Sequence, residues 1–259
     1  MSDQLRITLV QSNLVWENKT KNRAQFDKLL AKAKKTDVII LPEMFLTGFS
    51  MNAKPLAETM DGESVKWMKT KAKKLKAVIC GSLIIKENKK NYNRFVWVMP
   101  NGETYTYDKR HLFSPANEHK HYTPGNDKVL IHYKGWNIAP FICYDLRFPV
   151  WSRSVRAETD LMIYVANWPA PRNNAWKQLL IARAIENQCY VAGVNRIGKD
   201  ARGIDHYGSS RVSDFLGKTI LKGHKSQSWV KQITLDKKPM DEYRQKLPFW
   251  RDADAFVIK

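Results

Sequence analysis

Short runs of apolar residues alternate with longer amphipathic segments along most of the chain. The short runs predict buried strands, because they lack the length of a helix. They are residues 5–10, 37–41, 77–85, 136–142, 161–165 and 189–195, followed by 207–213, 219–221 and 228–235. The amphipathic segments predict helices at residues 17–35, 63–76, 148–157 and 173–187. Helices and strands in alternation indicate a layered α/β architecture.

The middle of the chain adds a hairpin and a long loop. Residues 92–99 and 104–107 flank the turn Pro100-Asn101-Gly102, an arrangement typical of a β-hairpin. Residues 110–127 are polar and contain two prolines, which predicts a long loop, and such loops are often functional. Since no Ser/Gly/Pro-rich linker and no repeat divides the sequence, we expect a single domain over residues 1–259.

Basic residues exceed acidic ones by a wide margin. The 259 residues include 44 Lys plus Arg and 25 Asp plus Glu, a formal net charge of +19. Such an excess is typical of nucleic-acid-binding proteins, but no zinc-finger spacing, ribonucleoprotein motif or basic-zipper heptad is present. Within residues 63–76, Val65, Met68, Ala72 and Leu75 recur on one helical face, and lysines cover the other. We therefore expect solvated helix faces and no nucleic-acid partner, with nucleic-acid binding as the distant alternative.

The sequence contains no pattern typical of a membrane-spanning or exported protein. No run of about 18 apolar residues predicts a transmembrane helix. The first six residues lack the charged-then-apolar pattern of a signal peptide. Three cysteines are an odd number for a chain of this length, which argues against a disulfide framework and for a reducing cytoplasm. We expect a cytoplasmic protein that does not bind membranes.

Three predicted strand ends carry reactive side chains, and active sites of α/β proteins collect at such ends. Glu43 follows residues 37–41, where partial desolvation would raise the pKa of its carboxyl group. Lys109 follows the hairpin and can supply positive charge to an oxyanion. Cys143 follows residues 136–142, where an exposed thiol beside a helix N-terminus would favour the thiolate. A solvated glutamate and a surface lysine are the alternatives at the first two positions.

Other candidate ligands and thiols are less persuasive. Cys80 and Cys189 lie inside β-rich runs and are expected to be buried small hydrophobes, which leaves Cys143 as the candidate nucleophile. Glu118, His119 and His121 invite a zinc interpretation, but no other His or Cys is spaced to complete the site. We therefore expect neither a metal nor a cofactor.

Together these motifs resemble the nitrilase superfamily of carbon–nitrogen hydrolases. The order Glu, Lys, Cys, each at a strand end, is that family's catalytic arrangement, and matching context extends from about Leu5 to Leu235. The matching segments are Leu-Pro-Glu-Met-Phe at 41–45, Lys-Arg-His-Leu-Phe at 109–113, Ile-Cys-Tyr-Asp-Leu-Arg-Phe-Pro at 142–149, Ala-Asn-Trp-Pro at 166–169, Ala-Arg-Ala-Ile-Glu-Asn-Gln at 182–188 and Gly-Ser-Ser-Arg-Val at 208–212. Residues 47–51 and 117–119 are most similar to the bacterial omega-amidase branch.

The resemblance implies a four-layer α-β-β-α sandwich that pairs into a homodimer and needs no cofactor. By position, Cys143 would be the nucleophile that forms a thioester, and Glu43 would relay its proton and later activate water. Lys109 and the backbone N–H of Tyr144 would stabilise the oxyanion. Glu118 matches the family's second glutamate, which orients Lys109 and the substrate amide.

Omega-amidases hydrolyse the terminal amide of 2-oxo acids such as 2-oxoglutaramate and 2-oxosuccinamate. The candidates to meet the carboxylate of such a substrate are Arg110, His111, Arg147 and Arg172. Phe45 and Trp168 are expected either to wall the pocket or to belong to the core. Another superfamily amidase, acting on deaminated glutathione or an N-carbamoyl amine, is the first alternative. An inactive member that serves as an interaction module is the second.

Overall fold

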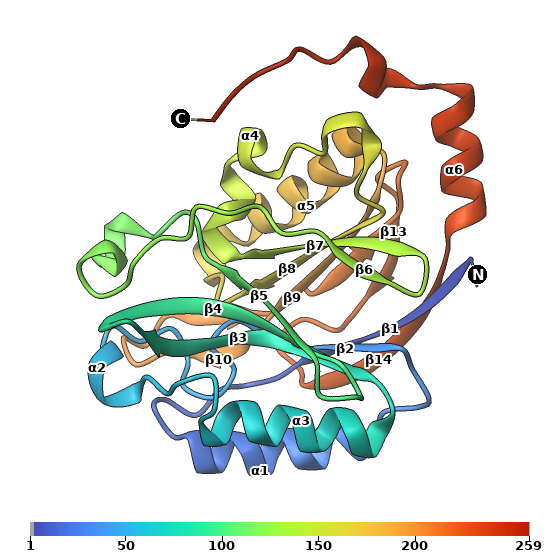
Figure 1. Cartoon of the computed structure of the whole chain (residues 1–259). Coiled ribbons are helices and arrows are strands. Elements are labelled where there is room, and N and C mark those ends of the chain that lie inside the picture. Colours follow the sequence, from blue (N-terminus) through green and yellow to red (C-terminus); the bar gives the residue numbers. More distant parts are fainter. Residues whose placement is uncertain (1–2, 259) are drawn as a thin grey trace.

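The computed structural model describes residues 3–258, which form two facing sheets with helices outside them (Figure 1). The first sheet has the strand order β14-β1-β2-β3-β4-β5. Its strands are β1 (Gln4–Gln11), β2 (Val38–Ile40), β3 (Val78–Glu87), β4 (Lys90–Val98), β5 (Thr104–Asp108) and β14 (Trp229–Asp236). Strands β1, β2 and β3 are parallel, and their neighbours on both sides pair antiparallel.

The second sheet repeats this plan with the order β13-β12-β9-β8-β7-β6. Its strands are β6 (Ile131–Tyr133), β7 (Trp136–Ile142), β8 (Leu161–Ala166), β9 (Tyr190–Asn195), β12 (Arg211–Ser213) and β13 (Thr219–Lys222). Strands β7, β8 and β9 are parallel. A separate ribbon pairs β10 (Ile197–Lys199) with β11 (Asp205–Tyr207).

Helices form the outer layers. Their bounds are α1 (Lys19–Leu30), α2 (Ala53–Leu56), α3 (Glu63–Leu75), α4 (Pro149–Ser152), α5 (Asn173–Asn187) and α6 (Lys237–Lys246). Short 3₁₀ turns are η1 (Ser114–Ala116), η2 (Glu118–Lys120), η3 (Cys143–Arg147), η4 (Val155–Ala157), η5 (Ala170–Arg172) and η6 (Phe249–Asp252). Figure 1 shows α1 and α3 beneath the first sheet and α5 over the second. No helix within residues 3–258 is long and apolar enough to cross a membrane.

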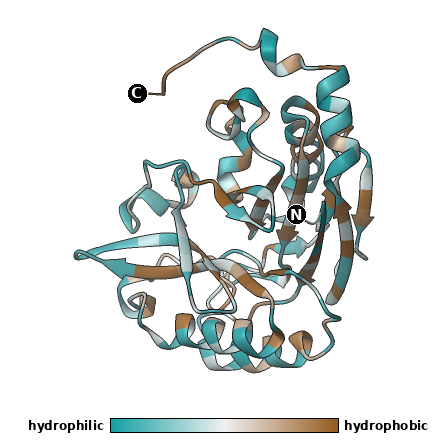
Figure 2. Cartoon of the chain, turned by 45° about the vertical axis from the view of Figure 1, so that its right-hand side comes forward, coloured by the Kyte–Doolittle hydropathy of each residue, from teal (hydrophilic) through white to brown (hydrophobic). Residues whose placement is uncertain are grey.

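Both faces of the central strands are buried, which explains their continuous apolar sequence. On β2, Val38 and Ile40 join the core between the two sheets, whereas Ile39 joins the core under α1 and α3. On β3, Val78 and Ile79 divide in the same way. This alternation with period 2 is the geometry of a strand covered on both sides. In Figure 2 long brown stretches run along the central strands, whereas the helices alternate between brown and teal segments.

Most predicted elements are confirmed, and the exceptions have local causes. Residues 136–142 and 173–187 coincide with β7 and α5. The helix predicted over 17–35 is shorter in the structure, where α1 runs from Lys19 to Leu30. The single helix predicted over 148–157 is wrong, because the backbone leaves helical geometry at Arg153 and again at Arg156, where φ is +59°. The strand predicted over 207–213 is also wrong, since its two ends belong to β11 and β12.

The lysine-covered helix faces are confirmed. In α3, Val65, Met68 and Ala72 are buried, while Lys66, Lys69, Lys73 and Lys74 are exposed. The sequence prediction missed α6, which is strongly polar and packs through Met240 and Arg244.

Candidate active site

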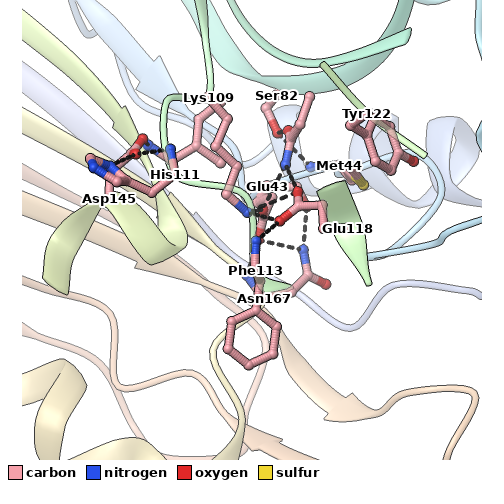
Figure 3. A network of polar contacts seen from close by, with 12 residues as sticks. Glu43, Met44, Ser82, Lys109, His111, Phe113, Glu118, Tyr122, Asp145 and Asn167 are labelled. Atoms are coloured by element: carbon pink, nitrogen blue, oxygen red, sulfur yellow. Dashed lines mark hydrogen bonds and ion pairs between the residues drawn. The ribbon is translucent and has the colours of Figure 1, made fainter. Parts of the chain in front are cut away.

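The two facing sheets bring three strand ends together. Glu43 follows β2, Lys109 follows β5 and Cys143 follows β7. The Lys109 Nζ atom lies 3.0 Å from Glu43 Oε1 and 2.9 Å from Glu118 Oε2. At most 1% of each of these three charged side chains is exposed. Figure 3 shows the Lys109 side chain reaching between the two carboxylates, so the sequence-separated candidates form one buried ionic cluster.

The carboxylate of Glu43 is held from both sides. Its Oε1 atom accepts a hydrogen bond from Asn93 Nδ2 at 2.8 Å, and its Oε2 atom accepts one from the backbone N–H of Asn167 at 2.8 Å. Ser82 Oγ donates to Asn93 Oδ1 at 2.8 Å and accepts from the backbone N–H of Met44 at 2.8 Å. These bonds satisfy the hydroxyl of Ser82 and the amide of Asn93 and fix the direction of the Glu43 carboxylate.

Burial and charge oppose one another within the cluster. Burial acts to lower the pKa of Lys109, but the negative charges of Glu118 and Glu43 outweigh it and raise that pKa. Burial raises the pKa of Glu118, and the charge of Lys109 only partly offsets this rise. The charge of Lys109 favours the ionised form of Glu118, but burial is the larger effect on the pKa of that carboxyl group. Glu118 also accepts the backbone N–H of Phe113 at 2.5 Å.

Cys143 occupies a strained turn between β7 and η3. Its φ is +45°, a left-handed conformation that non-glycine residues rarely adopt and that is often found at functional sites. The residue is half-buried and lines a cavity of about 310 Å³. Burial, reinforced by the charge of Glu43, raises the pKa of the thiol well above its usual range. The prediction of an exposed, thiolate-favouring cysteine is therefore wrong, because the carboxylates and the enclosure outweigh Lys109.

Asp145 ties this turn to β5. Its Oδ2 atom accepts from the backbone N–H of Ile142 at 3.0 Å and from the hydroxyl of Tyr107 at 2.7 Å. Its Oδ1 atom accepts from the backbone N–H of His111 at 2.9 Å and lies 2.9 Å from His111 Nδ1. The His111 ring stacks on Phe148 at 3.7 Å between centroids. His111 therefore supports the turn and does not line the cavity that contains Cys143, so its role in substrate binding stays a prediction.

The cavity wall combines aromatic and charged side chains. The sequence candidates Lys109, Cys143, Tyr144, Arg147, Trp168 and Arg172 line it, together with Trp16, Glu17, Phe49, Met51, Phe113, Asn167, Asp200, Arg202 and His206. Phe45 does not line it, and of its two alternatives the structure shows the core position. Its ring is fully buried and packs against Phe26 and Trp67, because the turn after Glu43 directs it into the core under the helices.

The zinc interpretation of the loop finds no geometric support. Glu118 points inward to Lys109, whereas His119 and His121 are exposed. Within residues 3–258, no three His, Cys, Asp or Glu side chains gather as a metal site would require.

Several supporting residues were not predicted from the sequence. Asn93 lies in the interior of β4, where Asn is unfavourable, and this mismatch was the available signal. Asn167 stands in the matching segment at 166–169 but carried no assigned role. Nothing in the sequence marked Ser82 or Tyr107, because their partners lie on distant strands.

Comparison against known proteins covers nearly the whole chain. A family model described as carbon-nitrogen hydrolase matches residues 6–245. The chain belongs to this carbon–nitrogen hydrolase family. The fold is the α-β-β-α sandwich of the nitrilase type, as the resemblance implied. A crystal structure of a CN-hydrolase superfamily protein from Xanthomonas campestris, with an arsenic adduct in its active site, superposes with a TM-score of 0.96 at 42% identity, covering 99% of each chain.

Two relatives of this carbon–nitrogen hydrolase carry more specific names. An omega-amidase, YafV from Escherichia coli, is 47% identical over 98% of this chain and 98% of its own length. A 2-oxoglutaramate amidase from Bacillus subtilis is 32% identical over 95% of this chain and 96% of its own length. Both comparisons span nearly the whole of both sequences.

Proposed function

We propose that this carbon–nitrogen hydrolase is an omega-amidase, which hydrolyses the terminal amide of 2-oxo acid amides such as 2-oxoglutaramate and 2-oxosuccinamate. The products are the 2-oxo dicarboxylate and ammonia. The observation that carries the proposal is a half-buried Cys143 thiol beside the Glu43–Lys109–Glu118 cluster, in a chain similar over nearly its whole length to two such amidases.

Acylation follows from the positions of the charges. Because the thiol of Cys143 has a raised pKa, it needs a base, and Glu43 takes its proton as Sγ attacks the amide carbonyl. Lys109 and the backbone N–H of Tyr144 stabilise the oxyanion of the tetrahedral intermediate. Glu43 returns the proton to the leaving nitrogen, the C–N bond breaks, and ammonia departs. Glu118 holds Lys109 in place.

Deacylation uses the same groups. Glu43 removes a proton from water, whose oxygen attacks the thioester carbonyl. The C–S bond breaks, the thiol is regenerated with that proton, and the carboxylic acid product leaves. Two steps with a covalent intermediate replace one difficult attack of water on an amide.

A turnover panel tests the substrate. Ammonia release is measured for 2-oxoglutaramate, 2-oxosuccinamate, glutamine, pentanamide, an N-carbamoyl amine and a nitrile. We expect the two 2-oxo acid amides to give the highest kcat/KM. A higher kcat/KM for the carbamoyl amine, or for deaminated glutathione added to the panel, would replace the proposal with another amidase activity.

Cysteine variants test the chemistry. Cys143→Ala should abolish turnover, and Cys189→Ala should retain it, because Cys189 is buried in β-sheet packing away from the cavity. Mass spectrometry of acid-quenched enzyme should detect an acyl adduct on Cys143. Turnover by Cys143→Ala would contradict the mechanism.

A homodimer and a cytoplasmic location complete the proposal, with residues 1–259 as one domain. Exposed apolar side chains occur on α4, η4, the end of α5, the turn before β13 and η6, at Val150, Val155, Ile185, Leu216 and Phe249. Turn η4 contacts η6, and Gly217 lies against Ile185. Exposed apolar side chains of this size are suited to contact with a second copy. Light scattering after size-exclusion chromatography should give a dimer mass, and Ile185→Lys should shift it toward a monomer.

The free thiols of Cys80, Cys143 and Cys189 fit a reducing compartment.

A further inference from the structure

The structure separates the four cationic candidates for the carboxylate of the substrate. Arg147 and Arg172 line the cavity that contains Cys143. Arg110 instead donates to the backbone oxygen of Gly125 and stacks over Trp151, outside that cavity. His111 is occupied by Asp145. Of the four candidates, Arg147 and Arg172 therefore remain.

Each of these arginines rests on an aromatic ring of the cavity wall. The Arg147 Cζ atom lies 5.0 Å from the centre of the Trp168 ring, and the Arg172 Cζ atom lies 5.1 Å from that of Phe113. The indole N–H of Trp168 donates to the backbone oxygen of Arg172 at 2.8 Å. Stacking on a ring restricts a guanidinium while leaving its N–H groups free to bind an anion.

Neither guanidinium forms an ion pair with a carboxylate within residues 3–258. The two acidic residues of the cavity wall are engaged elsewhere. Glu17 accepts from Ser50 Oγ at 2.5 Å, and Asp200 accepts the backbone N–H groups of Arg202 and Ile204. The positive charge of Arg147 and Arg172 is therefore available to a ligand.

The supporting rings also connect the arginines to the buried cluster. Trp168 follows Asn167, whose backbone N–H binds Glu43, and the backbone N–H of Phe113 binds Glu118. Arg147 ends η3, the turn that begins with Cys143. Arg147, Arg172 and the reacting groups are thus parts of one framework, which fixes where a substrate that contacts both must lie.

We propose that Arg147 and Arg172 bind the carboxylate at the far end of the substrate and so select amides that carry a distal anionic group. This inference rests on the proposed function and names the residues that decide its substrate class. Two guanidinium groups can together engage both carboxylate oxygens with charge-assisted hydrogen bonds. Arg202 also lines the cavity, but its guanidinium is not stacked on a ring of the described residues.

The test uses Arg147→Gln, Arg172→Gln and the double variant, with Arg110→Gln as the matched control. Ammonia release is measured with 2-oxoglutaramate, with glutaramate, and with pentanamide, which lacks the carboxylate. A hydrogen bond to a charged group contributes about 1.5–3 kcal/mol. Each single variant should therefore raise KM for the two carboxylated amides about 10-fold or more, with kcat little changed. Activity on pentanamide, and every parameter of Arg110→Gln, should stay within about twofold, the level of a distant surface change.

The outcomes separate this inference from the function on which it rests. If wild-type enzyme does not prefer carboxylated amides over pentanamide, the proposed substrate class fails. If wild-type enzyme has that preference and the arginine variants keep it, the proposed function stands and the arginine assignment is overturned. An equal loss on all three substrates would mean that the arginines support the structure of the wall. Partial recovery in Arg172→Lys, which keeps the charge but loses the planar fork, would support the assignment further.

Discussion

Two parts of the site hold charge in opposite ways. The floor is the buried cluster of Lys109, Glu43 and Glu118, and the rim is the pair Arg147 and Arg172. On the floor, Lys109 is enclosed with Glu43 and Glu118, and every charge has a partner within 3.0 Å. On the rim, Arg147 and Arg172 are exposed, stacked on rings and without carboxylate partners. A paired and buried charge is suited to reaction, because its position is fixed and its field is unscreened. An unpaired and exposed charge is suited to capturing an anion.

Substitutions in the floor and in the rim should therefore have different effects on stability and activity. Removing one member of a buried cluster leaves an uncompensated charge in the interior, so stability falls together with activity. Removing an exposed, unpaired arginine takes away a ligand contact and little else. Floor variants should therefore be measurable by unfolding, and rim variants only by kinetics.

The largest expected effect is on the floor. Lys109→Met leaves Glu43 and Glu118 facing each other without a cation, and we expect a loss of about 3–5 kcal/mol of unfolding free energy at pH 7 together with loss of turnover. Because the missing charge raises the pKa of Glu118 in the folded state further, the penalty should grow as the pH rises above about 4.3, the unfolded value, and vanish below it. Denaturant unfolding across pH measures both effects.

A double variant controls this result. Lys109→Met/Glu118→Gln replaces one of the two carboxylates with a neutral group of the same shape, so it should be more stable than Lys109→Met alone at pH 7. If both variants unfold at the wild-type midpoint, the cluster is not energetically coupled and the contrast between floor and rim is lost.

The reacting residues could be predicted from the sequence, whereas the packing and electrostatics around them could not. Glu43, Lys109 and Cys143 could be found because each follows a predicted strand, and the fold places those strand ends together. Phe45 could not be assigned, since the choice between core and wall depends on the turn after Glu43, where Met44 has a φ of +42°. The pKa of Cys143 was also beyond reach, because it depends on how closely the carboxylates of two distant segments enclose the thiol.

An intermediate effect is expected at Asp145, which joins the turn of Cys143 to β5. Asp145→Asn replaces an acceptor with an N–H₂ group that faces existing donors, so the turn should shift. A displacement of about 1 Å can cost about 100-fold in rate. We expect kcat to fall by up to about that factor while KM changes little, since Asp145 does not line the cavity.

Tyr107→Phe provides a milder control for this prediction. It removes one donor to Asp145 and should lower kcat less than Asp145→Asn does. If kcat in both variants matches that of wild-type enzyme although both fold, Asp145 supports the fold alone and does not position the nucleophile.

The smallest expected effect concerns the pH response of the Cys143 thiol, where we expect no change in rate over the interval in which an ordinary cysteine ionises. An ordinary cysteine ionises with a pKa of about 8.5, so a thiolate-dependent reaction accelerates between about pH 7 and 9. The folded pKa of Cys143 is raised, so its thiol should stay protonated through that interval and kcat/KM should show no rising limb there. The same shift predicts a stability contribution that is complete below about pH 8.5 and is lost as the pH rises further. Rates of inactivation by iodoacetamide, compared between wild-type enzyme and Glu43→Gln, measure the thiol directly. A rise centred at or below pH 8.5 that survives in Glu43→Gln would mean that Lys109 activates the thiolate without a base.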